Sequence, residues 1–283
     1  MPPLKSSLLT EAGFPHGFST REHDLSLTAV GYAATLDAFA KSVGLDAASL
    51  RQTRQVHGCV VVDADLPPPS AMPEADALVA TGRAAIGVRT ADCVPILVAD
   101  PVKGMRAAIH AGWRGYVAGV VEAAVAALRA RGAERLIAAV GPAIGPCCFE
   151  VGLDVALQIE KRAGVRLSVP GDPEKALVDL RGGVLRELRA VGVAEVERIE
   201  GCTRCDAQRF FSYRRGAEVG RMLAAIGPRS SAACGVARAT PIQSCRNNQP
   251  RREPDCRKPQ RGAFCGIRWG TATAFRRLLA PSS

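Results

Sequence analysis

Two histidines and one cysteine are the side chains that could together hold one metal ion. His57 lies in RQVHG just before an apolar run, Cys93 lies in TADC where a turn enters another such run, and His110 ends the apolar run RAAIH. Side chains at the ends of elements can converge on one cleft from distant parts of a chain. Imidazole and thiolate are the ligands that zinc prefers, and three protein ligands leave a fourth position for water or substrate, as in catalytic zinc sites.

The same three residues allow other interpretations, because their long spacing matches no compact zinc motif. Two histidines and a cysteine can also bind copper, but a multicopper centre needs several further histidines, and only His16 and His23 remain. Without a metal, Cys93 could be a nucleophile with His110 as its base, as in a cysteine hydrolase or deamidase. A structural cysteine with two ordinary histidines is the remaining alternative.

Several other side chains are candidates to bind substrate beside this trio. Arg21, Arg114 and Arg214 each carry a guanidinium whose planar fork matches phosphate geometry, although a lone arginine also serves in surface ion pairs. Trp113 could stack on a base or pack in the core. Asp92 could orient a metal ligand or a water molecule through a hydrogen bond, or it could cap a turn.

The elements that must position these residues alternate along residues 1–228. Short apolar runs predict strands, and apolar residues at helical spacing predict helices between them, the last of which has a weak point at Gly182 and Gly183. We therefore expect a single layered α/β domain with a mixed sheet. The expected strands are 59–62, 84–88, 96–99, 107–110 and 136–140, and the expected helices are 36–43, 117–131, 153–163 and 174–190.

Composition separates this domain from residues 229–283. The chain of 283 residues has a formal net charge of +10, and the ten arginines, one lysine and two acidic residues of 229–283 account for +9 of it. The stretch SCRNNQPRREPDCRKPQRG cannot bury enough apolar surface to offset chain entropy, so we expect a poorly ordered basic tail. The basic character therefore gives no reason to expect that the catalytic domain binds nucleic acid.

Neither a membrane span nor an export signal is apparent. No stretch reaches the roughly 18 uninterrupted apolar residues of a span, and MPPLKSSLLTEAGF lacks the apolar run of a secretory signal. We therefore expect a cytoplasmic protein whose ten cysteines are reduced. Cys147 and Cys148 are interpreted as packed structural thiols, with a position of one of them near the metal as the alternative. The CTRC motif at 202–205 could be redox-active or half of a zinc knuckle, but no second CxxC exists to complete a knuckle, so a structural role is favoured. The tail cysteines, which fit no zinc-ribbon spacing, are Cys234, Cys245, Cys256 and Cys265.

Seven sequence blocks together resemble the YfiH family. Its members were once called multicopper polyphenol oxidases, or laccase-like proteins, and are now described as purine nucleoside phosphorylases. The resemblance covers about residues 14–227, although residues 21–44 are shorter than the family's segment and lack its glycine-rich run, so one wall of the pocket is expected to differ. The blocks are HGFSTR at 16–21, QVHG at 55–58, TADCVPIL at 90–97, AAIHAGWRG at 107–115, VGPAIGPCCFEVG at 140–152, FFSYRR at 210–215 and GRM at 220–222.

The resemblance implies a zinc site made by His57, Cys93 and His110. It also implies a layered α/β fold shared with cysteine-dependent toxin domains of the cytotoxic-necrotizing-factor type. The implied reactions are phosphorolysis of adenosine, inosine and S-methyl-5′-thioadenosine to the free base and a ribose 1-phosphate, together with adenosine deamination. The expected partners are therefore a purine nucleoside and phosphate, and we expect a monomer. Because the H-x-E and PCxxC signature of zinc deaminases is absent, deamination would need a different general acid and base.

Overall fold

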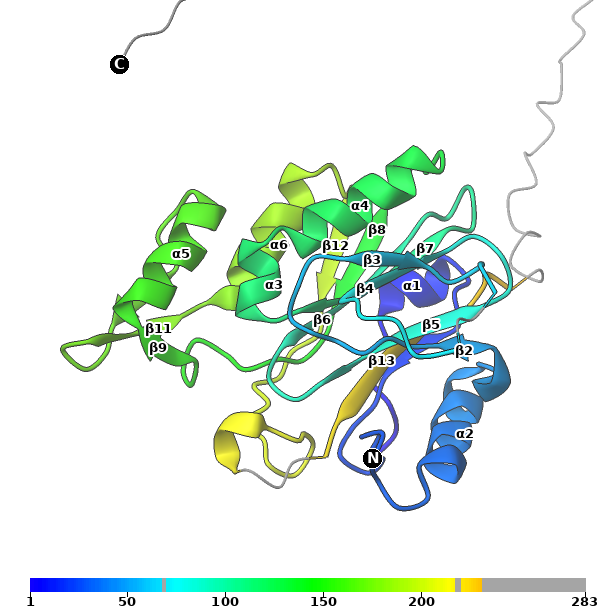
Figure 1. The fold of residues 1–283 in the computed structure, drawn as a ribbon, viewed down its shortest axis with the longest axis horizontal. Coiled ribbons are helices and arrows are strands. Elements are labelled where there is room, and N and C mark those ends of the chain that lie inside the picture. Colours follow the sequence, from blue (N-terminus) through cyan, green and yellow to red (C-terminus); the bar gives the residue numbers. More distant parts are fainter. Residues whose placement is uncertain (68–69, 217–219, 231–283) are drawn as a thin grey trace, which may run out of the picture. The chain divides into compact units, whose positions relative to one another are not determined.

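Two mixed β-sheets stack face to face in the computed structural model, which describes residues 1–67, 70–216 and 220–230. Helices α4 (Val120–Ala130) and α6 (Leu180–Ala190) cover the outer face of the larger sheet, and α2 (Tyr32–Val43) covers the outer face of the smaller one (Figure 1). The order of layers is therefore helix, six-stranded sheet, four-stranded sheet, helix. The structure confirms the layered α/β fold with mixed sheets that the sequence predicted.

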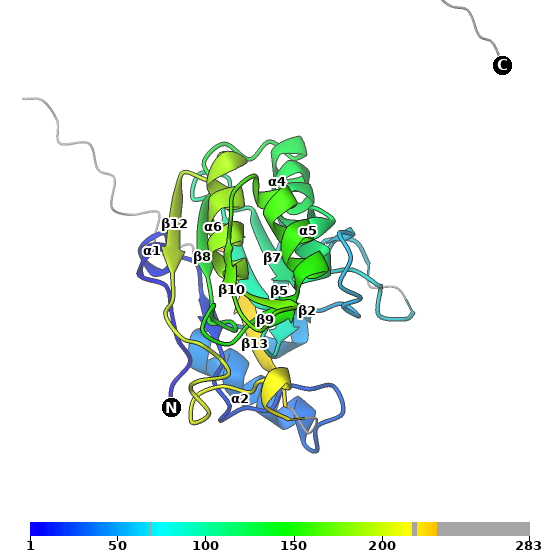
Figure 2. The same cartoon turned by 90° about the vertical axis from the view of Figure 1, so that its left-hand side faces the viewer.

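The strands form three sheets, the smallest of which lies beside α5 (Leu153–Ala163) (Figure 2). The six-stranded sheet has the order β12-β8-β6-β7-β4-β3, with bounds Glu195–Arg198, Ile137–Val140, Val94–Ala99, Arg106–Ala111, Ala77–Ala80 and Val61–Asp63. The four-stranded sheet has the order β1-β13-β5-β2, with bounds His16–Phe18, Met222–Ile226, Ala85–Thr90 and Leu50–Arg51. The three-stranded sheet has the order β10-β11-β9, with bounds Ser168–Pro170, Lys175–Val178 and Glu150–Gly152. The remaining helices are α1 (Ser7–Glu11), α3 (Trp113–Val117) and the 3₁₀ turns Ala47–Ser49 and Tyr213–Arg215.

Strand β6 illustrates how the larger sheet is buried on both faces. Ile96 and Val98 pack into the core beneath α4 and α6, while Leu97 and Ala99 pack toward the smaller sheet, because successive side chains of a strand point to opposite faces. Each fully buried aliphatic side chain stabilises the fold by about 1.5–3 kcal/mol relative to an exposed one. A strand covered on both faces is a continuous apolar run, which is the pattern that predicted this strand.

Most of the expected elements are present. The strands expected at 84–88, 96–99, 107–110 and 136–140 correspond to β5, β6, β7 and β8, and the helices expected at 36–43 and 153–163 lie within α2 and α5. The strand expected at 59–62 is displaced to Val61–Asp63.

Two expected helices begin later than the sequence indicated. The helix expected from residue 117 begins at Val120, because Gly119 adopts a left-handed conformation with φ of 87° and separates α4 from α3. The helix expected from residue 174 is wrong in its first part, because Lys175–Val178 form β11. Asp179 then caps α6 by accepting a hydrogen bond from the backbone N–H of Gly182 at 2.9 Å.

Gly183 explains why the glycine pair does not break α6. A Cβ atom at this position would lie 2.8 Å from Leu167 Cδ1 and 2.9 Å from Tyr116 Oη. The missing side chain lets the helix approach its neighbours closely. That packing offsets the cost of a glycine inside a helix, which is about 1 kcal/mol.

The first residues of the expected tail are hydrogen-bonded to the rest of the described chain. Arg229 donates to the carbonyls of Ala12 at 3.1 Å and Pro101 at 2.9 Å, and the backbone N–H of Ser230 donates to the carbonyl of Gly13 at 2.9 Å. The rest of the tail, residues 231–283, lies outside the described residues. Among the described helices, none has the length and hydropathy to cross a membrane.

Candidate functional site

The ends of strands at one edge of the larger sheet bring His57, Cys93 and His110 together. Strand β6 runs antiparallel to β7 with Pro95 opposite His110, so the start of β6 meets the end of β7. The loop before β3 carries His57 to the same place. The ligand atoms of the three residues all lie within 4.8 Å of one another, so the trio singled out in the sequence is one cluster in the structure.

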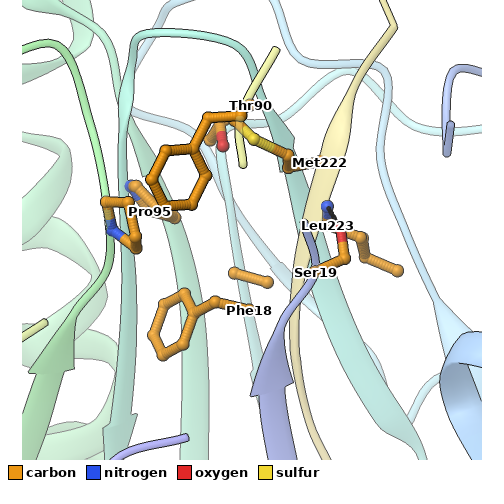
Figure 3. Close-up of a pocket in the computed structure, with 9 residues that line it drawn as sticks. Phe18, Ser19, Thr90, Pro95, Met222 and Leu223 are labelled. Atoms are coloured by element: carbon orange, nitrogen blue, oxygen red, sulfur yellow. Dashed lines mark hydrogen bonds between the residues drawn. The ribbon is translucent and has the colours of Figure 1, made fainter. Parts of the chain in front are cut away.

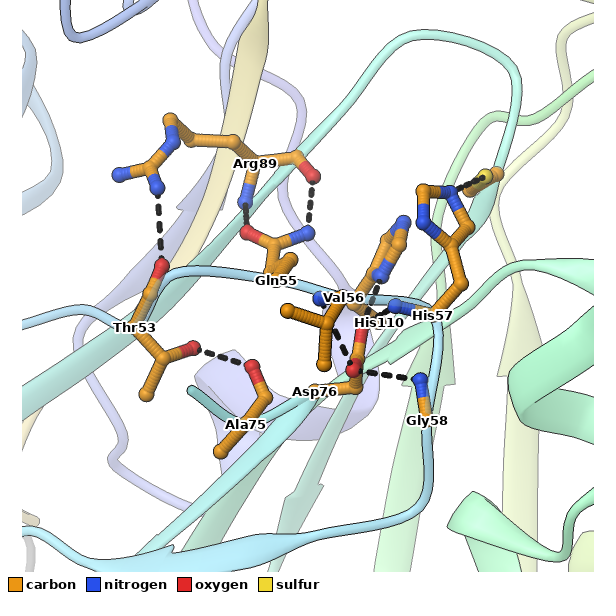
Figure 4. Close-up of polar contacts among 10 residues, drawn as sticks. Thr53, Gln55, Val56, His57, Gly58, Ala75, Asp76, Arg89 and His110 are labelled. Atoms are coloured by element: carbon orange, nitrogen blue, oxygen red, sulfur yellow. Dashed lines mark hydrogen bonds and ion pairs between the residues drawn. The ribbon is translucent and has the colours of Figure 1, made fainter. Parts of the chain in front are cut away.

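Asp76, which the sequence analysis missed, organises this cluster. Its buried carboxylate accepts hydrogen bonds from His110 Nδ1 at 2.7 Å and from the backbone N–H groups of His57 at 2.9 Å and Gly58 at 2.7 Å (Figure 4). Burial alone would raise the pKa of this carboxyl, but His110 and the backbone donors lower it below its usual value. The ionised carboxylate at Nδ1 leaves Nε2 of His110 free to bind a metal, which is the carboxylate–histidine–metal arrangement of many zinc sites.

The same carboxylate fixes the turn that carries His57. This residue has a φ of 61°, in the left-handed region that non-glycine residues rarely adopt. Its imidazole lies edge-on to that of His110, with ring centroids 4.9 Å apart, and its Nε2 lies 3.8 Å from Cys93 Sγ. Asp76 therefore sets the positions of both histidines, because it binds the backbone of His57 and the ring of His110.

Charges within the trio favour a thiolate. Burial raises the pKa of the Cys93 thiol, but the opposing effect of His110 and His57 is larger, so that the pKa falls below its usual value, to about 6. Burial lowers the pKa of His110, whereas Cys93 and Asp76 raise it, to about 9. At neutral pH the cysteine is therefore a thiolate, which is the form that binds metals and acts as a nucleophile.

The donor set and its surroundings fit a zinc ion. A Cβ atom at Gly112 would lie 2.6 Å from His57 Cδ2 and 3.1 Å from Cys93 Sγ, so a glycine is required where the chain passes the trio. Within the described part of the chain, no fourth histidine, cysteine or acidic side chain joins the group. One coordination position would thus stay open for water or substrate, as in catalytic zinc sites. The ligand types alone are equally compatible with copper.

A cavity of about 620 Å³ includes all three residues in its wall. This volume is in the range of small-molecule sites. Besides the trio, the cavity is lined by Arg54, Gln55, Arg89, Thr90, Ala91, Asp92, Trp113, Arg114, Phe149, Tyr213, Arg214 and Arg221. A much smaller space of about 10 Å³, lined by Phe18, Pro95 and Met222 among others (Figure 3), has room for no more than a single water molecule.

Three of the residues expected to bind substrate present cationic and aromatic surface to this cavity. The guanidinium of Arg114 lies 4.5 Å from the ring centroid of Trp113, and that of Arg214 lies 5.5 Å from the ring centroid of Phe149. Each pair places a cation over an aromatic face. The cavity therefore offers groups for an anion next to flat apolar surface.

The other two candidates have different surroundings. Asp92 lines the cavity with a φ of 89°, and its carboxylate accepts hydrogen bonds from Thr203 Oγ1 at 2.6 Å and from the backbone N–H of Arg214 at 2.7 Å. These contacts hold the turn that leads to Cys93. Arg21 does not line the cavity, and its guanidinium donates to the carbonyl of Ala207 at 2.6 Å.

Gln55 and Arg89 are cavity residues that the sequence analysis did not name. The Gln55 amide exchanges two hydrogen bonds with the backbone of Arg89, at 2.8 and 2.7 Å, and the Arg89 guanidinium donates to the carbonyl of Thr53 at 2.9 Å (Figure 4). Gln55 could have been found, because it belongs to the QVHG block next to His57. Arg89 lies in a strand whose apolar pattern predicts only core packing.

The family of the chain follows from a match over most of its length. The profile of the family described as multi-copper polyphenol oxidoreductase laccase matches residues 30–229. The chain belongs to this family. Purine nucleoside phosphorylase SCO2081 of Streptomyces coelicolor is 41% identical over 187 residues, which are 65% of this chain and 76% of that protein. Adenosine deaminase RL5, from an unknown prokaryotic organism, is 38% identical over 206 residues, which are 66% of this chain and 78% of that protein.

A solved structure shares the fold of the laccase-family chain. The crystal structure of the hypothetical protein YfiH from Bacillus licheniformis has a TM-score of 0.69 to it and 23% sequence identity, over 75% of this chain and 92% of that one. This likeness bears on the fold. The profile match confirms the family that the sequence blocks predicted.

Proposed function

We propose that this chain is a zinc-dependent purine nucleoside enzyme, which cleaves adenosine, inosine and S-methyl-5′-thioadenosine with phosphate and also deaminates adenosine. The observation that carries the proposal is the trio of His57, Cys93 and His110, which lines a cavity of about 620 Å³ together with arginines and aromatic rings. A nucleoside offers a flat base to the rings, and phosphate suits the guanidinium groups. The names of the two relatives, a phosphorylase and a deaminase, support the same substrate class.

The chain's own residues would bind and orient the two substrates. In phosphorolysis, phosphate attacks C1′ of the ribose and the base leaves, so the phosphate has to be held at a fixed position beside the sugar. Arg114 and Arg214 are the cationic anchors proposed for it, and Trp113 and Tyr213 offer aromatic surface for the base. A zinc ion on the trio would supply Lewis acidity and a polarised water, which deamination requires.

A metal-free cysteine hydrolase is the second candidate, and one observation favours it. His110 is hydrogen-bonded through Nδ1 to Asp76 at 2.7 Å. The pKa of Cys93 is lowered and that of His110 is raised, so the two side chains favour a thiolate and an imidazolium. In such an enzyme, Cys93, His110 and Asp76 would have the roles of nucleophile, base and orienting carboxylate. Such a triad would cleave an amide or ester through a covalent thioester.

A multicopper oxidase, as the family description suggests, has too few ligands in this chain. Besides the trio, the sequence contains only His16 and His23. His16 accepts a hydrogen bond from the Ser6 backbone at 2.8 Å and donates one to the Phe14 carbonyl at 2.8 Å, and His23 lies edge-on to Phe39. Neither lines the cavity, so among the described residues the trio is the only histidine-containing group that could hold copper.

Incubation of the full chain with each nucleoside, with and without phosphate, tests the proposal. Chromatography should detect free base and ribose 1-phosphate only when phosphate is present, and inosine from adenosine in its absence. Both activities should be lost after the metal is removed by a chelator and should return with zinc. Nucleoside turnover that survives metal removal would contradict the role of zinc, and thioester formation at Cys93 would favour the hydrolase.

Replacing Arg114 with alanine should raise the KM for phosphate about tenfold or more, because a hydrogen bond to a charged group is worth about 1.5–3 kcal/mol. The KM for the nucleoside should change less. Steady-state rates with each substrate varied in turn measure the two values. Arg21→Ala is the matched control, since Arg21 does not line the cavity and should leave both values unchanged. Equal effects of the two substitutions would contradict a phosphate role for Arg114.

A further inference from the structure

Four cysteines outside the cavity form a second cluster of thiols. The Sγ atoms of Cys147, Cys148, Cys202 and Cys205 all lie within 4.8 Å of one another. Cys205 Sγ lies 3.5 Å from Cys147 Sγ and 3.3 Å from Cys148 Sγ. All four are free thiols. The sequence interpretation treated the vicinal pair and the CxxC motif as separate structural features, but the structure joins them.

The topology of the larger sheet explains why the two pairs of cysteines lie together. Strands β8 and β12 are parallel neighbours, with Val140 opposite Arg198, so the loops that follow them leave the same edge (Figure 2). One loop carries the vicinal pair and the other carries the CxxC motif. A bridge between Ala143 and Cys202, with the backbone N–H of Thr203 donating to the Ala143 carbonyl at 3.1 Å, fixes the two loops to each other.

We propose that this cluster is a tetrathiolate zinc site, separate from the candidate catalytic centre. Four sulfur atoms bound to one zinc ion at about 2.3 Å form a tetrahedron with edges of about 3.8 Å. The separations in the cluster, from 3.3 Å to at most 4.8 Å, bracket that value. A cluster of several iron ions needs a wider cage, so the spacing selects a single ion. Tetrahedral coordination by four thiolates is a common arrangement of structural zinc sites.

Burial does not explain the four thiols. Cysteines that serve only to pack are among the most buried residues of proteins. Here Cys147 and Cys205 are exposed, while Cys148 and Cys202 are partly buried at the edge of the core. An exposed group of four converging thiols is an arrangement that metal coordination explains and core packing does not.

The surrounding polar groups favour negative charge on the sulfur atoms. The backbone N–H of Gly145 donates to Cys202 Sγ at 3.2 Å. The buried Arg181 donates to the carbonyl of Gly201 at 3.1 Å, and Arg215 donates to that of Thr203 at 2.9 Å, so two guanidinium groups bind the backbone around Cys202. A zinc ion with four thiolates has a net negative charge, which these donors and cations stabilise.

The proposed zinc site would support the cavity next to it. Thr203, inside the CxxC motif, donates to the Asp92 carboxylate at 2.6 Å, and Asp92 precedes Cys93 in the chain. Phe149, directly after the vicinal pair, lines the cavity. A zinc ion that holds the two loops together would therefore fix both a wall of the cavity and the turn that leads to the thiolate.

Counting zinc in cysteine variants tests the proposal. The starting protein is the full chain with Cys234, Cys245, Cys256 and Cys265 replaced by serine, so that zinc bound by the tail cannot contribute. Mass spectrometry of the metal should find two zinc ions per chain in this protein. Cys205→Ser and Cys93→Ser should each lower the count to one, and the double variant should hold none. Cys59→Ser, which alters an exposed cysteine outside both groups, should keep both ions.

Zinc X-ray absorption of the Cys93→Ser protein gives a second, independent measurement if Cys205→Ser fails to fold. Its remaining zinc should have four sulfur neighbours. A coordination shell of nitrogen and oxygen would overturn the proposal, and so would an unchanged zinc count in a folded Cys205→Ser protein. A disulfide between Cys205 and either vicinal cysteine, found by alkylation and peptide mass spectrometry without a reductant, would also overturn it.

Discussion

Replacement of His57 by alanine should lower kcat/KM for nucleosides by about a thousandfold or more, the scale on which loss of a catalytic group acts. The substitution removes one of three ligands in the proposed metal site. Relative to the metal-free parent protein, which lacks the stability that bound zinc adds, the melting temperature should fall by only about 2–4 °C, as for a loss of about 1 kcal/mol in a chain of this size. The reason is that His57 is exposed, and the contact that stabilises its turn is a backbone N–H to Asp76, which alanine retains.

Activity, bound zinc and thermal unfolding should be measured on the same preparation of this variant. His23→Ala is a matched control, because His23 contacts Phe39 and lies outside the trio, so it should keep both zinc and turnover. Unfolding of His57→Ala together with loss of activity would mean that the metal at the trio is structural. A folded and active His57→Ala would mean that the trio has no role in catalysis.

The fold was predictable where the chain is buried on both faces. Strands such as β6 are continuous apolar runs, and α5 has its apolar residues at helical spacing, so local pattern was sufficient. Strand β11 was missed because its residues KALV extend the helical pattern of Leu180–Ala190 toward the N-terminus. The stacking of two separate sheets could not be predicted either, since it depends on long-range pairs such as β1 with β13.

The candidate site was predictable to the extent that its residue types are rare. Histidine occurs four times in the chain, so two histidines and a cysteine at element ends stood out. Asp76 did not stand out, because it is one of many acidic residues and its role arises only when β4 is paired with β7. The four-cysteine cluster was hidden for a similar reason, because the parallel pairing of β8 with β12 that joins its two halves has no local signature.

Replacement of Asp76 by asparagine tests the residue on which both histidines depend. Oδ1 of Asp76 accepts from His110 Nδ1 and the His57 backbone, and Oδ2 accepts from the backbones of Val56 at 3.2 Å and Gly58 at 2.7 Å. An amide has one accepting oxygen, so in either orientation two of these donors lose their acceptor and face an NH₂ group. An unsatisfied buried donor costs about 1–3 kcal/mol.

The unfolding free energy of Asp76→Asn should therefore fall by about 3 kcal/mol, and zinc affinity at the trio should fall about 10–100-fold, as when a group that orients a metal ligand is altered. Denaturant unfolding should be measured on metal-free protein, because bound zinc adds its own stability to the folded state. A chelator competition measures the zinc affinity.

Asp65→Asn is a matched control for this variant. Asp65 also accepts hydrogen bonds from two backbone N–H groups, those of Thr81 at 2.6 Å and Gly82 at 2.9 Å, but it lies on an exposed turn away from the cavity. Asp65→Asn should lower the free energy of unfolding by less than Asp76→Asn does and should leave the zinc affinity unchanged. Equal effects of the two substitutions would mean that Asp76 only stabilises a turn.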